Sequence, residues 1–437
     1  MSEEIVIAVE GCCHGELDSI YETIAQAESA GAPKVELLIV CGDFQCVKDI
    51  LDLQCLAVPE KYRTMNSFYK YFSGESVAPV LTIFIGGNHE ASNVLQSLYY
   101  GGWVCPNIYF LGFAGVVNYK GLRIGGLSGI FNHQDYHLGH YENPPYKNGE
   151  LWSVYHLREL EVYRMAHLQA RVMQTPLDIF ISHDWPQGIW NYGDCRYLIK
   201  RKPYFEEDIR TGKLGSPPLM ALLKLLKPTY WFAAHMHVKF AAIVPHIDIE
   251  PSSYFQPEST QCFDGNTIKT RFLSLDKCLP GREFLQILKF PCNFSSCEAS
   301  TNSSSLLQYD LEWLAILKKT HHLLKIKRGV VEIPQQLYPP TDSDIQEIKE
   351  ILSRLPLGIC IPPHTQGMGQ PGSNEMTIPK ENGSDEVLRM LGLEHIWIEG
   401  CQRAAIDETR SGDSFPTNTE SKSLTDPNEI SLNDDES

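Results

Sequence analysis

The sequence lacks the features that mark membrane proteins and small secreted proteins. No apolar run approaches the roughly 20 residues that a membrane-spanning helix needs. The opening residues, MSEEIVIAVE, lack the basic flank and the long apolar core of a signal peptide. The 13 cysteines follow no repeating spacing, which argues against a disulfide framework. We therefore expect a soluble intracellular protein with no membrane partner, whose cysteines are mostly reduced thiols.

An excess of positive charge is absent as well. The chain carries 37 lysines and arginines against 54 aspartates and glutamates, for a net charge of −17. Such an excess of acid usually speaks against a nucleic-acid partner. The acidic residues are unevenly distributed, however, because residues 404–437 combine many acids with few bases and almost no large apolar side chains. That composition predicts a disordered acidic tail, and the milder charge of the rest excludes neither kind of partner.

Short apolar runs alternate with helical patterns over residues 1–250, which predicts an α/β layered fold. The expected strands begin at seven positions: Ile5, Val35, Val80, Ile108, Leu122, Leu177 and Thr229. A second, smaller region over 265–400 has one strand-like piece, TRFLSLDKCLP, and several helical pieces such as LLQYDLEWLAILKKTHHLLK. We predict one domain over 1–250, a C-terminal α-rich domain over 265–400, and the tail over 404–437.

Five of the apolar runs end in residues that can bind metal ions. They are followed by GCCHGE at 11–16, CGDFQ at 41–45, GGNHEAS at 86–92, SHDWP at 182–186 and AAHMH at 233–237. Loops at strand ends can bring such side chains together. Each motif also has a structural interpretation: a single loop histidine is usually a surface or hydrogen-bonded residue, Asp43 could cap a helix, and Cys12 and Cys13 could fill the core. The joint occurrence in this order favours a metal site.

The order G-x-x-H-G, GDF, GNHE, SH and H-x-H resembles that of the calcineurin-like metallophosphoesterases. Two positions depart from the usual pattern of that family, since Cys12 stands where an aspartate is usual and Ala234 replaces a glycine. With these departures, the stretches GCCHGELD, FIGGNHEASN, YGGWVCPNIYFLG and KPTYWFAAHMHVKFAA resemble the RNA lariat debranching enzymes. The resemblance is dense over residues 5–290 and weaker to about residue 400. It implies a metallophosphoesterase β-sandwich flanked by helices.

The resemblance also implies an activity, namely two-metal hydrolysis of the 2′–5′ phosphodiester bond at the branch point of excised intron lariats, which gives linear RNA. The implied ligands of one ion are Cys12, His14, Asp43 and His237. Those of the other are Asp43, Asn88, His183 and His235. His89 would contact the scissile phosphate as the catalytic residue and could protonate the leaving oxygen. Branched RNA is the expected partner, with splicing-associated proteins as further partners and the nucleus as the location.

The metals implied by the resemblance are two divalent ions per chain, either Fe²⁺, Zn²⁺ or Mn²⁺. A thiolate favours Zn²⁺ or Fe²⁺ over harder ions such as Mn²⁺, so Cys12 as a ligand would bias the first site toward these metals. The alternative that Cys12 does not touch a metal stays open at this point. Cys13 points the other way along an extended backbone, and we interpret it as a packing residue.

Residues 129–150 interrupt the α/β pattern with many histidines, tyrosines and prolines. We predict a recognition loop that holds the branch nucleotides, because aromatic and imidazole faces stack on unpaired bases. The candidate substrate-binding residues are His133, Tyr136, His137, His140, Tyr141 and Tyr146. A long surface loop without a binding role is the alternative. The stretch CRYLIKRKPYF, from Cys195, is equally compatible with a phosphate path and with a solvated basic turn.

Two other functions remain to be weighed against debranching. One is a metallophosphoesterase with another substrate, such as a protein phosphatase or a cyclic-nucleotide phosphodiesterase. The cysteine in place of aspartate and the insertion at 129–150 count against it. The other is a non-catalytic RNA-binding or scaffolding module that kept the fold, and the retention of every ligand position except Cys12 counts against that.

Overall fold

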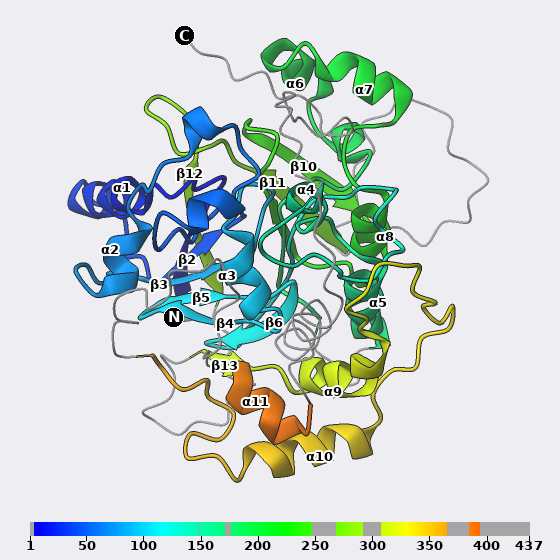
Figure 1. The fold of residues 1–437 in the computed structure, drawn as a ribbon. Coiled ribbons are helices and arrows are strands. Elements are labelled where there is room, and N and C mark those ends of the chain that lie inside the picture. The colour runs from blue at the N-terminus through cyan, green and yellow to red at the C-terminus, as the bar shows by residue number, and fades with distance from the viewer. Residues whose placement is uncertain are drawn as a thin grey trace, which may run out of the picture.

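Two β-sheets pack face to face, and helices cover the outer face of each sheet (Figure 1). The computed structural model describes residues 4–147, 149–170, 176–246, 268–291, 307–364 and 384–393. The predicted α/β sandwich flanked by helices is confirmed, and each of the seven apolar runs contains a strand. The predicted acidic tail lies outside the described residues.

The first sheet has a parallel centre and two antiparallel edge strands. Its order is β12 (Leu285–Pro291), β1 (Glu4–Glu10), β2 (Leu37–Val40), β3 (Leu81–Phe84), β5 (Ile108–Phe110) and β4 (Gly102–Cys105). Three helices pack on its outer face, namely α1 (Leu17–Ser29), α2 (Phe68–Ser73) and α3 (Ser92–Ser97). Two 3₁₀ turns, Asp52–Cys55 and Glu60–Tyr62, lie in the long connection between β2 and α2.

The second sheet has seven strands. Its order is β10 (Phe240–Pro245), β11 (Lys269–Ser274), β9 (Tyr230–Ala233), β8 (Ile179–Ser182), β7 (Leu122–Leu127), β6 (Ala114–Tyr119) and β13 (Gln308–Tyr309). The helices that cover it are α5 (Glu159–Ala166), α8 (Pro217–Leu226), α9 (Leu311–Thr320) and α10 (Asp342–Leu352). The remaining helices are α4 (Glu150–Ser153), α6 (Cys195–Arg201), α7 (Phe205–Thr211) and α11 (Ser384–Leu391), with 3₁₀ turns at His167–Ala170, Ile189–Tyr192 and His321–Leu323.

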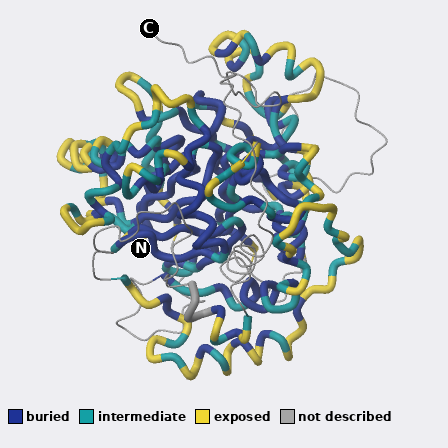
Figure 2. The backbone as a smooth tube through the Cα atoms, in the orientation of Figure 1, coloured by how far each residue is buried: buried dark blue, intermediate teal, exposed yellow. Residues whose placement is uncertain are grey.

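Alternation along the strands explains the layered core. In β1, Ile5, Ile7 and Val9 face the second sheet, whereas Val6 and Ala8 face the helices. Successive side chains of a strand point to opposite faces, so a continuous apolar run is what a strand buried on both sides requires. Figure 2 shows the result, with buried backbone through the sheets and exposed backbone along the outer helices and loops. Within the described ranges, no helix combines the length and the apolar character that crossing a bilayer requires.

The chain beyond residue 265 adds strands to both sheets as well as helices. Strand β11 pairs with β9 and β10, β12 pairs with β1, and β13 pairs with β6. The helix expected across LLQYDLEWLAILKK begins only at Leu311, because the carboxylate of Asp310 accepts a hydrogen bond from the backbone N–H of Trp313 and caps the helix there. The residues before the cap are extended and form β13. How the chain divides into domains stays a prediction.

A buried ion-pair network ties α9 to the second sheet. Arg123 of β7 is 3% exposed, and its guanidinium donates to both oxygens of Asp310, at 2.7 and 2.9 Å, and to Glu312 at 2.8 Å. Asp310 and Glu312 are buried as well. The charge of Arg123 and its hydrogen bonds hold the pKa of Asp310 below its usual range, against the opposing effect of burial. One cation therefore pairs with two buried carboxylates from the C-terminal region.

We predict that Arg123→Met lowers the free energy of unfolding by about 3–5 kcal/mol, because it leaves two buried carboxylates without their cation. Urea denaturation followed by circular dichroism measures the change. Arg210→Met, which removes an exposed arginine paired with Glu207 on α7, serves as the control and should cost less than about 0.5 kcal/mol. An Arg123→Met protein as stable as the parent would mean that apolar packing alone holds α9.

Candidate metal centre

The ends of strands from both sheets meet at one place. Cys12 follows β1, Asp43 follows β2, Asn88 follows β3, His183 follows β8, and His235 follows β9. Parallel strands direct their carboxyl ends to the same edge of a sheet, and here the edges of the two sheets lie next to each other. The five sequence motifs are thereby brought into a single site.

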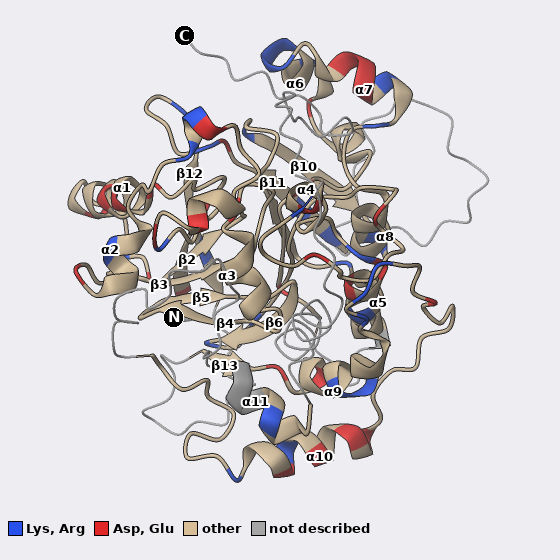
Figure 3. Ribbon diagram, in the orientation of Figure 1, with Lys and Arg blue, Asp and Glu red and all other residues tan. Residues whose placement is uncertain are grey.

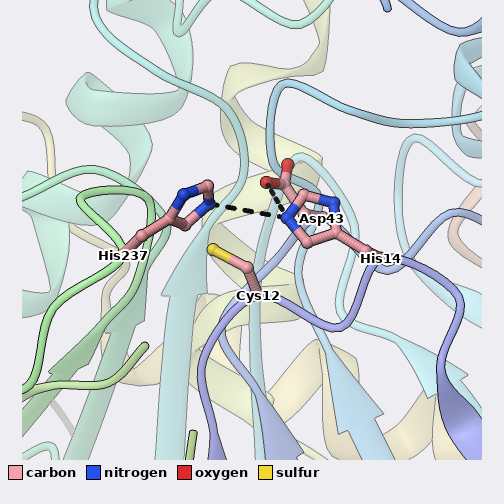
Figure 4. Close-up of side chains that lie close together, drawn as sticks. All are labelled: Cys12, His14, Asp43 and His237. Carbon is pink, nitrogen blue, oxygen red and sulfur yellow. Dashed lines mark hydrogen bonds and ion pairs between the residues drawn. The ribbon is translucent and has the colours of Figure 1, made fainter. Parts of the chain in front are cut away.

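Four side chains form one compact group: Cys12, His14, Asp43 and His237. One ligand atom from each lies within 4.8 Å of the corresponding atoms of the other three. Figure 4 shows the imidazoles of His14 and His237 facing each other beside the carboxylate of Asp43, with the sulfur of Cys12 below. The Nε2 atom of His14 lies 3.5 Å from Nε2 of His237 and 3.7 Å from Oδ2 of Asp43.

The chemistry of this group fits a divalent cation. Oδ2 of Asp43 is buried and accepts no hydrogen bond from the described residues, which is costly for a charged oxygen unless a cation lies beside it. Imidazole, thiolate and carboxylate are the ligands that Zn²⁺ and similar ions take in proteins. The backbone N–H of His235 donates to Sγ of Cys12 at 3.2 Å, which supports negative charge on the sulfur. These four residues are the ligands implied for the first ion.

A second group lies on the other side of Asp43. Nε2 of His183 is 3.3 Å from Oδ1 of Asp43 and 3.1 Å from Oδ1 of Asn88, and the ring centre of His235 is 5.0 Å from that of His183. Nδ1 of His183 lies 2.8 Å from the carbonyl oxygen of Cys41. A carbonyl can only accept, so Nδ1 carries a proton. Asp43 raises the pKa of this imidazole against the effect of burial, so a cation that binds at Nε2 would displace a proton there. The two oxygens of Asp43 thus face two different sets of candidate ligands.

The loops that carry these ligands are strained. His14, Asp43, His235 and His237 have φ angles between 46° and 62°, a region that residues other than glycine rarely adopt. Such conformations cost about 1–3 kcal/mol each and concentrate at functional sites. The hydrogen bond from the N–H of His14 to the carbonyl of Asp43, at 2.6 Å, helps to hold two of these loops together.

Glycine is required where the ligands pack against the backbone. A Cβ atom on Gly87 would lie 2.2 Å from Oδ1 of Asp43, and one on Gly42 would lie 2.3 Å from Nδ1 of His183. Both distances are far below van der Waals contact. The glycines of the CGDFQ and GGNHE motifs therefore make room for the shared carboxylate and for the histidine beside it.

Electrostatics prepares the histidines to act as ligands. Burial lowers the pKa of His14 to about 4 and that of His235 to about 3, and it holds the pKa of His237 well below its usual value. All three are therefore neutral near pH 7 and keep a nitrogen lone pair. Burial and then the charge of Asp43 raise the pKa of the Cys12 thiol, so binding of a cation there would release a proton.

Asp43 itself stays ionised. Burial opposes its charge, but His183 first, and then His89 and His14, hold the pKa of this carboxyl well below its usual range. His89 adds a hydrogen bond from its backbone N–H to Oδ1 of Asp43 at 2.9 Å. Asp43 is thus a stable anion, and in the reverse direction its charge raises the pKa of His183 against the effect of burial.

Glu90 is a site residue that the sequence did not reveal. It is 1% exposed, and its carboxylate accepts hydrogen bonds of 2.8 Å from the backbone N–H groups of Phe44, Gln45 and Gly87. Glu90 therefore joins the loop after β2 to the loop after β3. Burial and the charge of Asp43 raise its pKa to about 8. Its place in the GGNHE motif was visible, but donors 45 residues away in the chain were not.

The predicted recognition loop is well anchored. Its two exposed histidines are His133 and His137, whereas Tyr136, Tyr141 and Tyr146 are half-buried. Beneath them, Arg158 donates to Glu142 at 2.5 Å, and both side chains are buried. These contacts fix the loop against the body of the protein, and base stacking by its exposed residues stays a prediction.

The prediction that His140 stacks on a base does not fit the structure, because the side chain of His140 is only 2% exposed. Its Nε2 lies 3.0 Å from Glu161, and its ring packs edge-on against Tyr99 and Phe113. A side chain enclosed in this way cannot stack on a base without leaving the core. His140 therefore anchors the loop to α5, and the sequence could not distinguish this histidine from its exposed neighbours.

The basic stretch from Cys195 forms α6 and the turn after it. Lys200 and Arg201 end α6, and the neighbouring helix α7 begins with three acids, Glu206, Glu207 and Asp208 (Figure 3). Opposite charges on adjacent helices weaken the local positive field. The structure therefore gives this stretch no clear preference for a phosphate path over a solvated turn.

Comparison with known proteins identifies the family. The model of calcineurin-like phosphoesterases matches residues 5–239, and the model of the lariat debranching enzyme C-terminal domain matches residues 267–388. The lariat debranching enzyme of Homo sapiens is 42% identical over 459 residues, covering 98% of this chain and 80% of the human protein. That of Danio rerio is 44% identical, covering 98% and 77%, and that of Arabidopsis thaliana is 48% identical, covering 79% and 74%. The chain belongs to the lariat debranching enzyme family.

Proposed function

We propose that this protein hydrolyses the 2′–5′ phosphodiester bond at the branch point of excised intron lariats and returns linear RNA. The observation that carries the proposal is the shared carboxylate of Asp43, whose two oxygens face two sets of metal ligands in a chain of the debranching family. Such a pair of sites is typical of enzymes that hydrolyse phosphate esters. Because lariats arise from splicing, we place the protein in the nucleus, with splicing-associated proteins as further partners.

We propose that each site holds one divalent ion. Cys12, His14, Asp43 and His237 would hold one, and Asp43, Asn88, His183 and His235 the other. Bound ions supply Lewis-acid activation of the phosphate and of a water molecule. Fe²⁺, Zn²⁺ and Mn²⁺ are the candidates, and the sulfur of Cys12 favours Zn²⁺ or Fe²⁺ in the first site.

His89 is placed to handle the proton of the leaving group. Its backbone N–H is fixed by Asp43, and its Nε2 lies 3.2 Å from Nδ2 of Asn88. An amide NH₂ group can only donate, so Nε2 accepts and the proton of a neutral His89 lies on Nδ1. That nitrogen has no hydrogen-bond partner among the described residues. We propose that the half-buried His89 gives its proton to the departing 2′-oxygen.

The remaining residues of the site orient these groups. Glu90 fixes the loops that carry Asp43, Asn88 and His89, so that the shared carboxylate and the proton donor keep their relative positions. Gln45 lies with Nε2 3.2 Å from Nδ1 of His14 and restrains that ring. We propose that the exposed His133 and His137 and the half-buried Tyr136 stack on the branch nucleotides.

Cleavage of branched and linear RNA of the same sequence tests the proposal. We expect the metal-loaded enzyme to release linear product from the branched RNA and to leave the linear RNA intact. Asp43→Ala should abolish cleavage and lower the metal content measured by mass spectrometry, because the shared carboxylate is gone. Asp342→Ala, at an exposed position on α10, is the control. Equal cleavage of both RNAs, or none of the branched RNA, would refute the function.

The role of His89 has its own test. We expect His89→Ala to keep both metals but to lower kcat by about 10²–10⁴, the usual contribution of a general acid. Single-turnover kinetics and metal analysis of the same preparation separate the two effects. Loss of metal from this variant would show that His89 is a ligand and would contradict the assignment.

Cys12 offers a test of the metal preference. After chelation and reloading, Cys12→Asp should lose activity with Zn²⁺ relative to Mn²⁺, because the soft ligand is replaced by a hard one. Cys12→Ser should bind the first metal more weakly than the parent protein or Cys12→Asp, since a neutral hydroxyl replaces a charged ligand. The control is Cys13→Ser, since Cys13 packs against the helical side of the first sheet and should affect stability alone. Unchanged metal profiles in both Cys12 variants would exclude the sulfur as a ligand.

A further inference from the structure

A segment of the C-terminal region, residues 325–331, pairs with the loop 129–150. The backbone N–H of Val331 donates to the carbonyl of His137 at 2.8 Å, that of Gly139 to Gly329 at 3.0 Å, and that of His140 to Lys325 at 3.0 Å. Leu138 and Val330 form an antiparallel bridge at the same place. The two segments lie about 190 residues apart in the sequence, so neither motif analysis nor periodicity indicated this contact.

The pairing is close and specific. A Cβ atom on Gly139 would lie 2.7 Å from the carbonyl oxygen of Lys327 and 2.8 Å from that of Lys325, so only glycine allows this approach. Leu324 is 4% exposed and packs with Leu160 and Tyr99, which fixes the start of the segment to the body of the protein. The position of residues 325–331 beside the loop is therefore determined by the fold.

The paired segment has the sequence KIKRGVV and exposes three cations, Lys325, Lys327 and Arg328. None of the three forms a salt bridge with a carboxylate of the described residues. Lys325 donates to the carbonyl of His322, and the guanidinium carbon of Arg328 lies 5.3 Å from the ring centre of Tyr141 in the loop. We call residues 325–331, which carry these three cations, the basic segment.

The charge of the surroundings makes the basic segment unusual. The chain has a net charge of −17, and the neighbouring lysines Lys318 and Lys319 on α9 are both neutralised, by Glu347 at 2.5 Å and Asp344 at 3.0 Å. Three of the acids around the loop are already paired, Glu159 with His137, Asp135 with His156 and Glu142 with Arg158, and Glu332 is exposed. Three uncompensated cations next to exposed loop imidazoles combine a site for phosphates with a site for bases.

We propose that the basic segment binds the phosphate backbone of RNA that continues from the branch point, so that the C-terminal region extends the surface of the loop 129–150. The proposal rests on the proposed function, in which that loop holds the branch nucleotides. Arg328 is held over the ring of Tyr141 and presents its remaining donors to a phosphate, whereas the lysines act as point charges. The contribution is to affinity for long substrates, since no group of the segment touches the reacting atoms.

Lys327→Ala/Arg328→Ala tests the proposal, because the segment pairs with the loop through main-chain atoms that these substitutions keep. The two substrates are a minimal branched RNA and a branched RNA with long single-stranded arms. We expect KM to rise for the long substrate only, with kcat unchanged. The slope of log(kcat/KM) against log salt for that substrate should become shallower by about 0.7 for each phosphate that the variant no longer binds.

The matched control is Lys318→Ala/Lys319→Ala, which removes two neutralised lysines from the same region and should leave both substrates unaffected. Lys327→Arg, which keeps the charge and leaves Arg328 in place, should retain most of the affinity, as expected for contacts with phosphate rather than with a shaped pocket. Unchanged KM and salt slope on the long RNA would overturn the proposal, and so would equal losses on both substrates.

Two further outcomes distinguish the proposed debranching function from the proposed role of the basic segment. If the parent enzyme fails to cleave the minimal branched RNA, the proposed function fails, whatever the basic segment does. If the variant loses binding to phosphatidylserine vesicles while its RNA kinetics stay unchanged, the segment serves an anionic membrane and the proposal for RNA is refuted.

Discussion

Burying the charge of Asp43 is the constraint on which the site depends. A fully buried carboxylate is stable only where opposite charge or donors surround it, and Oδ2 has no donor among the described residues. The protein places His183 and His14 on its two sides, gives Oδ1 the N–H of His89, and keeps glycine at positions 42 and 87 where any side chain would collide with the ligands. A divalent cation beside Asp43 would supply the opposite charge that this carboxylate lacks.

The sandwich supplies the rigidity that this arrangement needs. The ligands stand at the ends of strands from both sheets, in loops with backbone conformations that only a well-packed neighbourhood can maintain. Glu90 links two of these loops through backbone donors, and Arg123 ties the C-terminal helix α9 to the sheet behind them. The unfavourable backbone conformations of the loops at the metal centre are therefore stabilised by the packed core and by ion pairs outside the site.

The C-terminal region is part of this framework as well as an addition to it. It provides strands to both sheets, covers the second sheet with α9 and α10, and supports the loop 129–150 by main-chain pairing at 325–331. The loop starts next to the GGNHE motif, where the backbone N–H of Gly129 donates to the carbonyl of Gly86 at 2.8 Å, and its position also depends on residues that lie far along the chain. The phosphoesterase fold and the C-terminal region therefore share sheets, packed helices and main-chain hydrogen bonds.

The sequence alone determined the strands, their two-sided burial and the order of the metal-binding motifs, because these follow from local periodicity and from residues adjacent in the chain. The sequence left open whether Cys12 binds a metal. Only the structure placed its sulfur within 4.8 Å of possible ligand atoms of His14, Asp43 and His237. The burial of His140, the three hydrogen bonds of Glu90 and the pairing of Gly139 with the basic segment also appeared only in three dimensions. Each depends on atoms from distant parts of the sequence, and no local pattern encodes which distant backbone group a side chain will meet.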